Sequence, residues 1–237
     1  MLNIQNRAAV SFNMPVSEAA QPTPSIVYTP AGVGLEHPSV VSVLKRCLDI
    51  VGAIVGLLIT VVLFLPIAIA IQIDNPGSIF YSQVRCGHRG RTFRIWKFRS
   101  MVANADALKH LVENEAQGLV FKNKKDPRIT RVGALLRKTS LDEFPQFLNV
   151  LKGEMSLVGT RPPTVDEVMQ YEPHHWERLN VKPGITGEWQ VRGRSSVTDF
   201  EEIVKMDLQY QSKWSLVYDL QLIFETVLAV VHRKGAY

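Results

Sequence analysis

The longest apolar run of the chain extends from Ile50 to Ile73 and contains no charged residue. It exceeds the length of about 18 residues at which an apolar segment becomes a candidate membrane helix. Pro66 lies two-thirds of the way along it, where proline removes a backbone hydrogen bond and clashes with the preceding turn. Two interpretations follow: a single straight span, or a helix that breaks near Pro66 and returns to the leaflet it entered.

Basic residues flank the apolar run on both sides. Lys45 and Arg46 precede it, and a group of basic residues without any acidic neighbour follows it: Arg85, Arg89, Arg91, Arg94, Lys97 and Arg99. Positive charge favours the cytoplasmic side of a membrane. A straight span would place one flank outside, so the charges favour a re-entrant membrane helix hairpin over residues 41–73, broken at Pro66.

The rest of the chain alternates strand-like and helical patterns. Two strand-like runs, Ile79 to Val84 and Thr92 to Phe98, are separated by turn residues at positions 87–90. Helical patterns then follow at Ala103 to Gln117, Leu141 to Lys152, Glu201 to Ser212 and Leu216 to His232. The sequence therefore predicts a mixed α/β domain over residues 74–237, with a short strand pair and several helices.

Composition bounds the remaining segments and the partners. Residues 1–40 carry few charges and five prolines, which predicts a flexible tail. The 237 residues suffice for one sizeable domain, and the net charge of +5 favours an anionic partner: nucleic acid, a lipid headgroup or a phosphorylated substrate. The two cysteines give no disulfide framework, and the six histidines show no metal-ligand spacing.

The densest group of chemically active residues is the stretch from Arg137 to Gln146. Ser140 and Glu143 fit the S-x-x-E pattern of a helix capping box. A helix that starts at Asp142 instead would place Pro145 in the first turn, where its missing N–H is not needed. In both cases two adjacent carboxylates lie at a helix start near cations, which favours ionised groups able to act as a nucleophile or a Mg²⁺ ligand. The spacing leaves capping and chemistry both open.

Two later loops have the composition of anion-binding sites. Residues 157–163 form a proline-rich loop with one cation, Arg161, and residues 182–195 combine three glycines with Trp189, Arg192 and Arg194. Glycine lets backbone amides approach a phosphate, and arginine binds it bidentately. The sequence contains neither an ATP-binding P-loop nor a recognised nucleic-acid-binding motif, which argues against nucleic acid as the partner.

Taken together, seven motifs in a fixed order resemble the bacterial sugar transferase family, the monotopic polyprenyl-phosphate phosphoglycosyl transferases. The resemblance extends from about residue 43 to Tyr237. One departure is Thr160, where the family more often has proline. The motifs are Lys45–Asp49, the apolar segment with Pro66, Lys97–Met101, Asp126–Thr130, Ser140–Gln146, Gly159–Pro162 and Lys182–Gly187.

The resemblance implies a two-step transfer of a sugar-1-phosphate from a UDP-sugar to polyprenyl (undecaprenyl) phosphate. Asp142 would attack the β-phosphate, release UMP and carry the phosphosugar until the lipid phosphate attacks it. Asp142 and Glu143 would form the metal site for Mg²⁺, the implied cofactor. Arg137 would grip a phosphate, and the remaining candidates for phosphate contacts are Lys97, Arg99, Arg161 and Arg194.

The resemblance also implies a place in the cell: the bacterial inner membrane, with the catalytic domain facing the cytoplasm, at the first membrane step of exopolysaccharide, capsule or O-antigen assembly. The rival hypothesis is a non-enzymatic, membrane-anchored scaffold that binds anionic lipid or a polyanion. It accounts for the charge but leaves Asp142 and Glu143 among the cations unexplained. The sugar and the oligomeric state, including a homo-oligomer, stay open.

Overall fold

The computed structural model describes residues 36–231 apart from 116–117, 122, 124 and 194–196. Most of the predicted tail, residues 1–35, and the candidate Arg194 therefore lie outside the described residues. The end of the predicted tail is ordered: helix α1 (Pro38–Val41) begins at His37, whose side chain accepts a hydrogen bond from the backbone of Ser39. Ordered structure thus begins a few residues before the predicted end of the tail.

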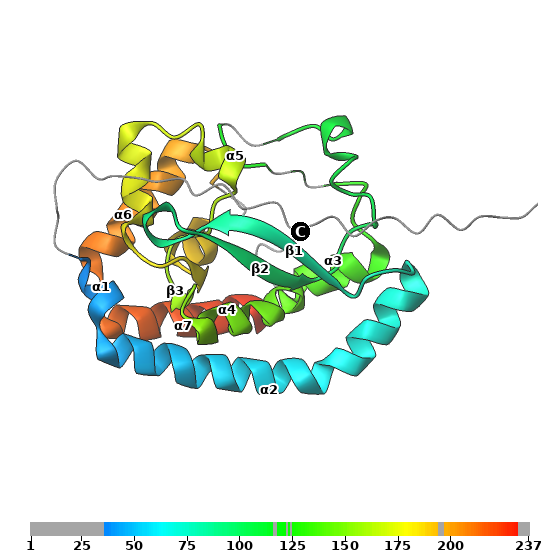
Figure 1. The fold of residues 1–237 in the computed structure, drawn as a ribbon, viewed down its shortest axis with the longest axis horizontal. Helices are drawn as coiled ribbons and strands as arrows, with labels where there is room; N and C mark the ends of the chain where they lie inside the picture. The colour runs from blue at the N-terminus through cyan, green and yellow to red at the C-terminus, as the bar shows by residue number, and fades with distance from the viewer. Residues whose placement is uncertain (1–35, 116–117, 122, 124, 194–196, 232–237) are drawn as a thin grey trace, which may run out of the picture.

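The apolar segment forms one long helix, α2 (Val43–Asp74), which starts at Ser42 and ends at the extended residue Asn75. Among the described residues it is the one helix long and apolar enough to cross a membrane. Pro66 lies inside it, and α2 bends in its second half rather than dividing into two helices (Figure 1). A bend is the usual effect of an internal proline. The re-entrant hairpin itself stays a prediction.

Both ends of α2 are fastened to the same domain. Near its start, the Asp49 carboxylate accepts hydrogen bonds from the Ser156 hydroxyl at 2.8 Å and the Leu157 amide at 2.9 Å. At its last residue, Asp74 accepts from the Val132 amide at 2.8 Å. In between, a Cβ at Gly56 would lie 2.4 Å from the Phe147 ring, so glycine allows the closest approach. The helix thus lies along the domain instead of leading away from it.

A buried ion pair holds the start of α2 against the end of the chain. Lys45 Nζ lies 2.5 Å from Asp219 Oδ2, and both side chains are almost fully buried. Tyr210 Oη and Trp214 Nε1 also donate to the Asp219 carboxylate, at 2.8 and 3.1 Å. The pair therefore joins α2 to the two C-terminal helices.

We expect Lys45→Met to lower the free energy of unfolding by about 3 kcal/mol, because it leaves the Asp219 charge buried without its cation. Thermal and denaturant unfolding in detergent measure the change. Lys205→Met is the matched control, since the Lys205 side chain is exposed and lies 3.9 Å from Glu202; its effect should be small. Equal effects of the two variants would contradict the prediction.

The strand pair is an antiparallel hairpin of β1 (Phe80–Cys86) and β2 (Thr92–Phe98), connected by the 3-10 turn η1 (His88–Gly90). The second strand has the predicted bounds, and the first ends two residues later than predicted. The predicted helix over Ala103–Gln117 is wrong for its described part, which contains turns and the short 3-10 helix η2 (Lys109–Leu111). Within this segment, the Ala105 carbonyl accepts a hydrogen bond from the Arg128 guanidinium.

The remaining elements surround this hairpin (Figure 1). Strands β3 and β4 form a separate parallel pair. The predicted helices near the C-terminus are confirmed as α6 and α7. In chain order the elements are α3 (Arg131–Lys138), η3 (Leu141–Gln146), α4 (Phe147–Lys152), β3 (Ser156–Val158), α5 (Val165–Val168), η4 (Pro173–Asn180), β4 (Gly184–Thr186), η5 (Trp189–Gly193), α6 (Phe200–Lys213) and α7 (Leu216–Val231).

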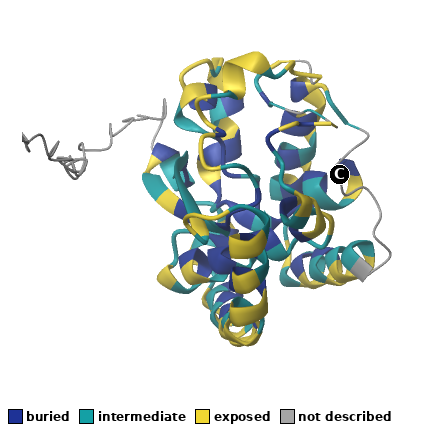
Figure 2. Cartoon of the chain, turned by 90° about the vertical axis from the view of Figure 1, so that its right-hand side faces the viewer, coloured by how far each residue is buried: buried dark blue, intermediate teal, exposed yellow. Residues whose placement is uncertain are grey.

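One side of the molecule is apolar and exposed. The outward side of α2 carries exposed leucine, isoleucine and valine residues, among them Leu58 and Val62. Figure 2 shows exposed positions along the outer side of this helix. Helix α7 buries Leu222 completely but exposes Leu220, Phe224 and Val227. Apolar patches of this kind mark a surface that meets lipid or another protein. We call this side, formed by exposed residues of α2 and α7, the apolar face.

Candidate active site

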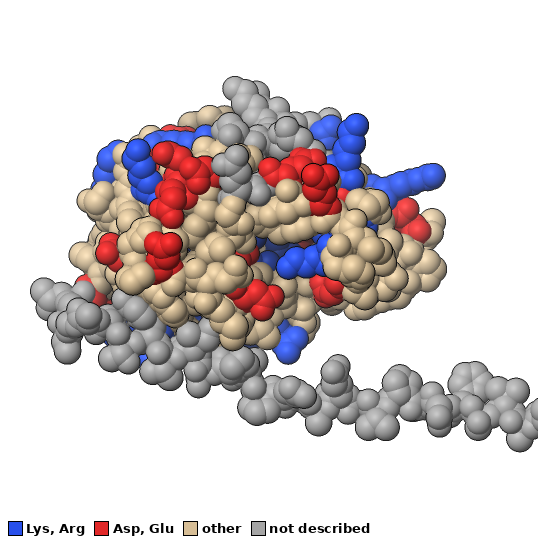
Figure 3. Space-filling view, turned by 90° about the horizontal axis from the view of Figure 1, so that it is seen from above, with Lys and Arg blue, Asp and Glu red and all other residues tan. Residues whose placement is uncertain are grey.

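A pocket of about 550 Å³ brings the predicted site residues together. Seen from the side away from α2, the surface is hollowed, and lysine and arginine side chains lie in the hollow (Figure 3). Six of the seven predicted catalytic and substrate-binding residues line the pocket, and the seventh, Arg194, lies outside the described residues. The six are Lys97, Arg99, Arg137, Asp142, Glu143 and Arg161.

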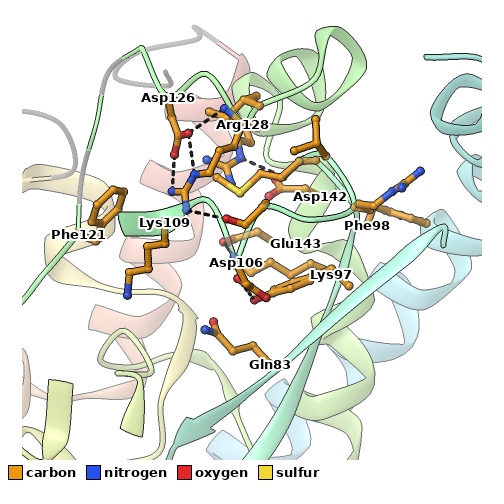
Figure 4. A pocket seen from close by; sticks show the side chains of 18 of the residues that line it. Gln83, Lys97, Phe98, Asp106, Lys109, Phe121, Asp126, Arg128, Asp142 and Glu143 are labelled. Carbon is orange, nitrogen blue, oxygen red and sulfur yellow. Dashed lines mark hydrogen bonds and ion pairs between the residues drawn. The ribbon is translucent and has the colours of Figure 1, made fainter. Parts of the chain in front are cut away.

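Asp142 is buried in this pocket, with 6% of its surface exposed, on the short 3-10 helix η3 (Figure 4). Burial raises the pKa of its carboxyl above the usual range, whereas the charges of Lys97 and Arg137 pull the pKa back down. The expectation that dipole and cations leave this group readily ionised is therefore incomplete. A desolvated carboxyl next to two cations is a candidate nucleophile.

The capping-box hypothesis for Ser140 and Glu143 is wrong. Ser140 has a left-handed backbone, with φ of 56°, and its side chain makes no capping hydrogen bond. A capping residue needs an extended backbone, which directs its oxygen to the first amides of the helix. The Glu143 carboxylate instead accepts from Lys97 Nζ at 2.6 Å, across from β2. The left-handed turn thus leaves both Asp142 and Glu143 available to the pocket.

The predicted basic residues have different partners. Arg137 Nε donates to the Ser100 hydroxyl at 2.9 Å, which orients its guanidinium at the pocket wall. Arg99 lines the pocket, but its guanidinium donates to the carbonyls of Asn75 and Pro76 and so fastens the segment after α2. Its phosphate contact stays a prediction, and its visible role is anchoring.

Two arginines lie together at the far side of the pocket. Arg161 Nη1 lies 3.4 Å from Glu167, and its guanidinium lies 5.9 Å from the centre of the Trp189 ring. Arg85, which the sequence analysis did not single out, lines the same pocket and donates to the Pro162 carbonyl at 3.0 Å. Burial, and then the charge of Arg161, lower the pKa of Arg85 to about 10. Two close cations with few acidic partners favour the binding of an anion at this side of the pocket.

At the other end of the pocket, a rigid ion pair forms the wall. Arg128 makes a bidentate contact with Asp126, at 2.9 and 2.6 Å, and its guanidinium lies 5.2 Å from the centre of the Phe121 ring (Figure 4). The motif Asp126–Thr130 therefore shapes the pocket, and Arg128 is already satisfied by its partners. Phe121 offers an aromatic surface here, which sequence reasoning missed because a loop position gives no periodic pattern.

Away from this pocket, the structure brings together His174, His175 and Glu201, whose ligand atoms lie within 4.8 Å of one another. The sequence analysis found no metal-ligand spacing among the histidines and therefore did not predict this group. However, His175 Nδ1 accepts from the Glu172 amide at 3.0 Å. The ring proton then resides on Nε2, which donates to Glu201 at 2.6 Å. Because that nitrogen has no free lone pair, the group is a hydrogen-bonded cluster and a poor metal site.

Comparison with known proteins assigns the fold and the pocket to one family. The model of the bacterial sugar transferase family matches residues 40–233. This chain belongs to that family. The match includes every described element from the end of α1 to α7, and therefore the whole pocket around Asp142.

Three relatives illustrate the similarity. The galactosyl transferase CpsE of Streptococcus agalactiae is 53% identical over 194 residues, which cover 81% of this chain and 43% of CpsE. A UDP-glucose:undecaprenyl-phosphate glucose-1-phosphate transferase of Escherichia coli is 40% identical, with coverage of 82% and 41%. The exopolysaccharide production protein ExoY of Rhizobium meliloti is 38% identical, with coverage of 94% and 100%. The chain thus spans about two fifths of the first two proteins and all of ExoY.

Proposed function

We propose that this chain transfers a sugar-1-phosphate from a UDP-sugar to undecaprenyl phosphate, with release of UMP, in the assembly of an exopolysaccharide, capsule or O-antigen. One observation carries the proposal: a buried carboxyl, Asp142, lies in a basic pocket next to Glu143 and Lys97. The names of relatives support the substrates, because one is an undecaprenyl-phosphate galactose phosphotransferase and another a UDP-glucose:undecaprenyl-phosphate glucose-1-phosphate transferase.

In the proposed first step, a carboxylate oxygen of Asp142 forms a bond to the β-phosphorus of the UDP-sugar. The bond from that phosphorus to the bridging oxygen breaks, and UMP leaves with the electron pair. Lys97 and Arg137 are the cations whose charges act on Asp142, so they are placed to offset the negative charge of the phosphates. Burial of Asp142 removes most of the water from around its carboxyl.

In the proposed second step, an oxygen of the lipid phosphate forms a bond to the phosphorus of the aspartyl phosphosugar. The bond from that phosphorus to Asp142 breaks and restores the carboxylate. The product is a lipid-linked sugar diphosphate, and the two steps consume no further reactant. The covalent intermediate requires a nucleophile that two different phosphates reach in turn, which a pocket open to solvent on one side allows.

Mg²⁺ is the cofactor we propose for this site. Mg²⁺ is bound in proteins by one or two carboxylates plus substrate phosphates, and Asp142 with Glu143 supply such a pair in one pocket. When bound, the ion supplies charge neutralisation for the departing phosphate. The Glu143 carboxylate also forms an ion pair with Lys97 Nζ at 2.6 Å. A bound Mg²⁺ would therefore share this carboxylate with the lysine or displace the lysine from it.

We propose further that α2 is a re-entrant anchor in the bacterial inner membrane, with the catalytic domain in the cytoplasm. Its two ends support this, because Asp49 and Asp74 bind the same domain through Leu157 and Val132. A straight span would place the ends on opposite sides of the bilayer, and these contacts could not coexist. The apolar face is then the side in contact with lipid.

Cysteine labelling tests this orientation. A membrane-impermeant thiol reagent added to spheroplasts should fail to label cysteines placed at Pro38 and at Arg91 and should label both after lysis. Cys47 is exposed and is replaced by serine beforehand. Pro66→Ala should shift some molecules toward labelling at one end, because it removes the local bend. If the protein that keeps Pro66 is labelled at one end in intact spheroplasts, α2 is a straight span.

An assay of UMP release tests the activity itself. Purified enzyme with undecaprenyl phosphate, Mg²⁺ and a panel of UDP-sugars, UDP-glucose and UDP-galactose first, should release UMP with at least one sugar. The rival hypothesis, a non-catalytic scaffold, predicts lipid binding without UMP release for every sugar. The same panel identifies the preferred sugar.

A further inference from the structure

We propose that a second pocket next to the catalytic one holds the first isoprene units of the polyprenyl phosphate and directs its phosphate to Asp142. The inference rests on the proposed function and adds the route of the lipid. The second pocket has a volume of about 490 Å³. Its walls are apolar and come from three parts of the chain: Phe144 and Phe147 of η3 and α4, Ile185 and Trp189 around β4 and η5, and Val227 and Val230 of α7.

The head of the second pocket coincides with the basic side of the catalytic pocket. Arg85, Lys97 and Arg161 line both pockets, and so does Glu143. A ligand that fills the second pocket therefore places one end among three cations beside the predicted metal carboxylate. An anionic end suits this place, because Arg85, Lys97 and Arg161 line it from both pockets.

The other end of the second pocket opens on the apolar face. Val227 lines the pocket and is 54% exposed, next to the exposed Phe224 and Leu228 on α7. Phe147, on the opposite wall, packs against Gly56 of α2, so α2 lies directly beside that wall. An apolar ligand can thus pass from the lipid-facing side to the catalytic pocket without crossing water.

Polar atoms at the head of the pocket also point to a ligand with a polar end. Arg85 Nε and Trp189 Nε1 are buried donors without a hydrogen-bond partner among the described residues. Trp189 is 8% exposed, and both residues line the second pocket. Buried donors are nearly always paired in folded proteins. A lipid phosphate, with its several acceptor oxygens, satisfies donors that the apolar walls leave unpaired.

The occupant is the lipid rather than the nucleotide, because the two pockets differ in chemistry. The catalytic pocket continues toward polar residues and Phe121, which suit a ribose and a base. The second pocket continues toward valines and phenylalanines, which suit a hydrocarbon chain. In the second step the lipid phosphate then approaches the phosphosugar from the side of Arg85 and Arg161, whose charges offset its own.

Separate measurement of the two half-reactions tests the inference. Enzyme is mixed with UDP-glucose or UDP-galactose alone for the UMP burst, and then with undecaprenyl phosphate for transfer. Val227→Trp fills the mouth of the second pocket. The burst should stay within about twofold of the wild type. Transfer should fall by about tenfold or more, which is the rate loss expected when a pocket loses hydrocarbon contacts. Leu220→Trp is the control, since Leu220 is 52% exposed on the same helix and lies outside the lining; both its rates should stay near wild type.

A second variant tests the head of the pocket. Arg85→Gln should raise the apparent KM for undecaprenyl phosphate by about tenfold while the KM for the UDP-sugar changes less than about twofold, because it removes a charged donor to the lipid phosphate. Normal transfer by Val227→Trp with a normal burst overturns the lipid route. Loss of the burst in that variant also overturns it, because the pocket would then serve the nucleotide. A wild-type enzyme with neither a burst nor transfer overturns the proposed function itself, whereas transfer without a burst overturns the covalent intermediate.

Discussion

Asp142→Asn is expected to abolish sugar-phosphate transfer and the covalent phosphosugar adduct while the protein still folds. The amide has the size of the carboxyl but cannot act as a nucleophile, and turnover should fall by at least about four orders of magnitude, as for other covalent nucleophiles. Mass spectrometry of enzyme incubated with UDP-sugar alone locates the adduct in the wild type. An adduct mapped to another residue would rule out this role of Asp142.

The same variant has a stability signature, because burial raises the pKa of Asp142. An acid whose pKa is raised in the folded state binds its proton more tightly there than in the unfolded chain. The wild type therefore loses stability as the pH rises from about 4 through the raised pKa, whereas asparagine has no proton to lose. The Tm of Asp142→Asn should equal or exceed that of the wild type at about pH 8, and the difference should vanish toward about pH 4. A large fall in Tm at both pH values would indicate a structural role instead.

The sequence predicts the elements better than it predicts their contacts. Periodicity locates α6 and α7 almost to the residue, because each has a regular helical pattern of apolar residues, and β2 has the predicted bounds. Periodicity fails at residues 103–115, where contacts with later parts of the chain, such as that of Arg128 with the Ala105 carbonyl, have no signal in the local pattern. It also leaves open how α2 ends, because the contacts of Asp49 and Asp74 join segments far apart in sequence.

For the site, too, the sequence predicts which residues take part better than it predicts their contacts. Family motifs identify Asp142, Glu143 and Arg137, and the structure places all three in one pocket. The spacing of Ser140 and Glu143 fits a capping box, which the left-handed backbone of Ser140 excludes. A left-handed conformation at a serine has no signal in the sequence. Arg85 is one of six similar basic residues around the hairpin, and its place beside Arg161 in the pocket is visible only in the structure.

Glu143→Gln is expected to lower activity by about two orders of magnitude or more, because it removes a charged oxygen from a hard cation that prefers carboxylates. The amide keeps a hydrogen-bond acceptor for Lys97, which now lies 2.6 Å from the carboxylate, so the pocket should keep its shape and the Tm should change little. The decisive measurement is the Mg²⁺ concentration for half-maximal activity. It should rise in Glu143→Gln, and added Mg²⁺ should restore part of the activity by mass action.

Lys97→Met separates a metal ligand from a partner that only positions the lysine. It breaks the same ion pair but keeps the Glu143 carboxylate as a possible metal ligand. Activity should fall because a cation near Asp142 is lost, yet the half-maximal Mg²⁺ concentration should stay the same or decrease. The two variants therefore shift the Mg²⁺ dependence in different directions if Glu143 binds the metal. If Glu143 serves only to hold Lys97, both variants lose activity together and the Mg²⁺ dependence of Glu143→Gln is that of the wild type.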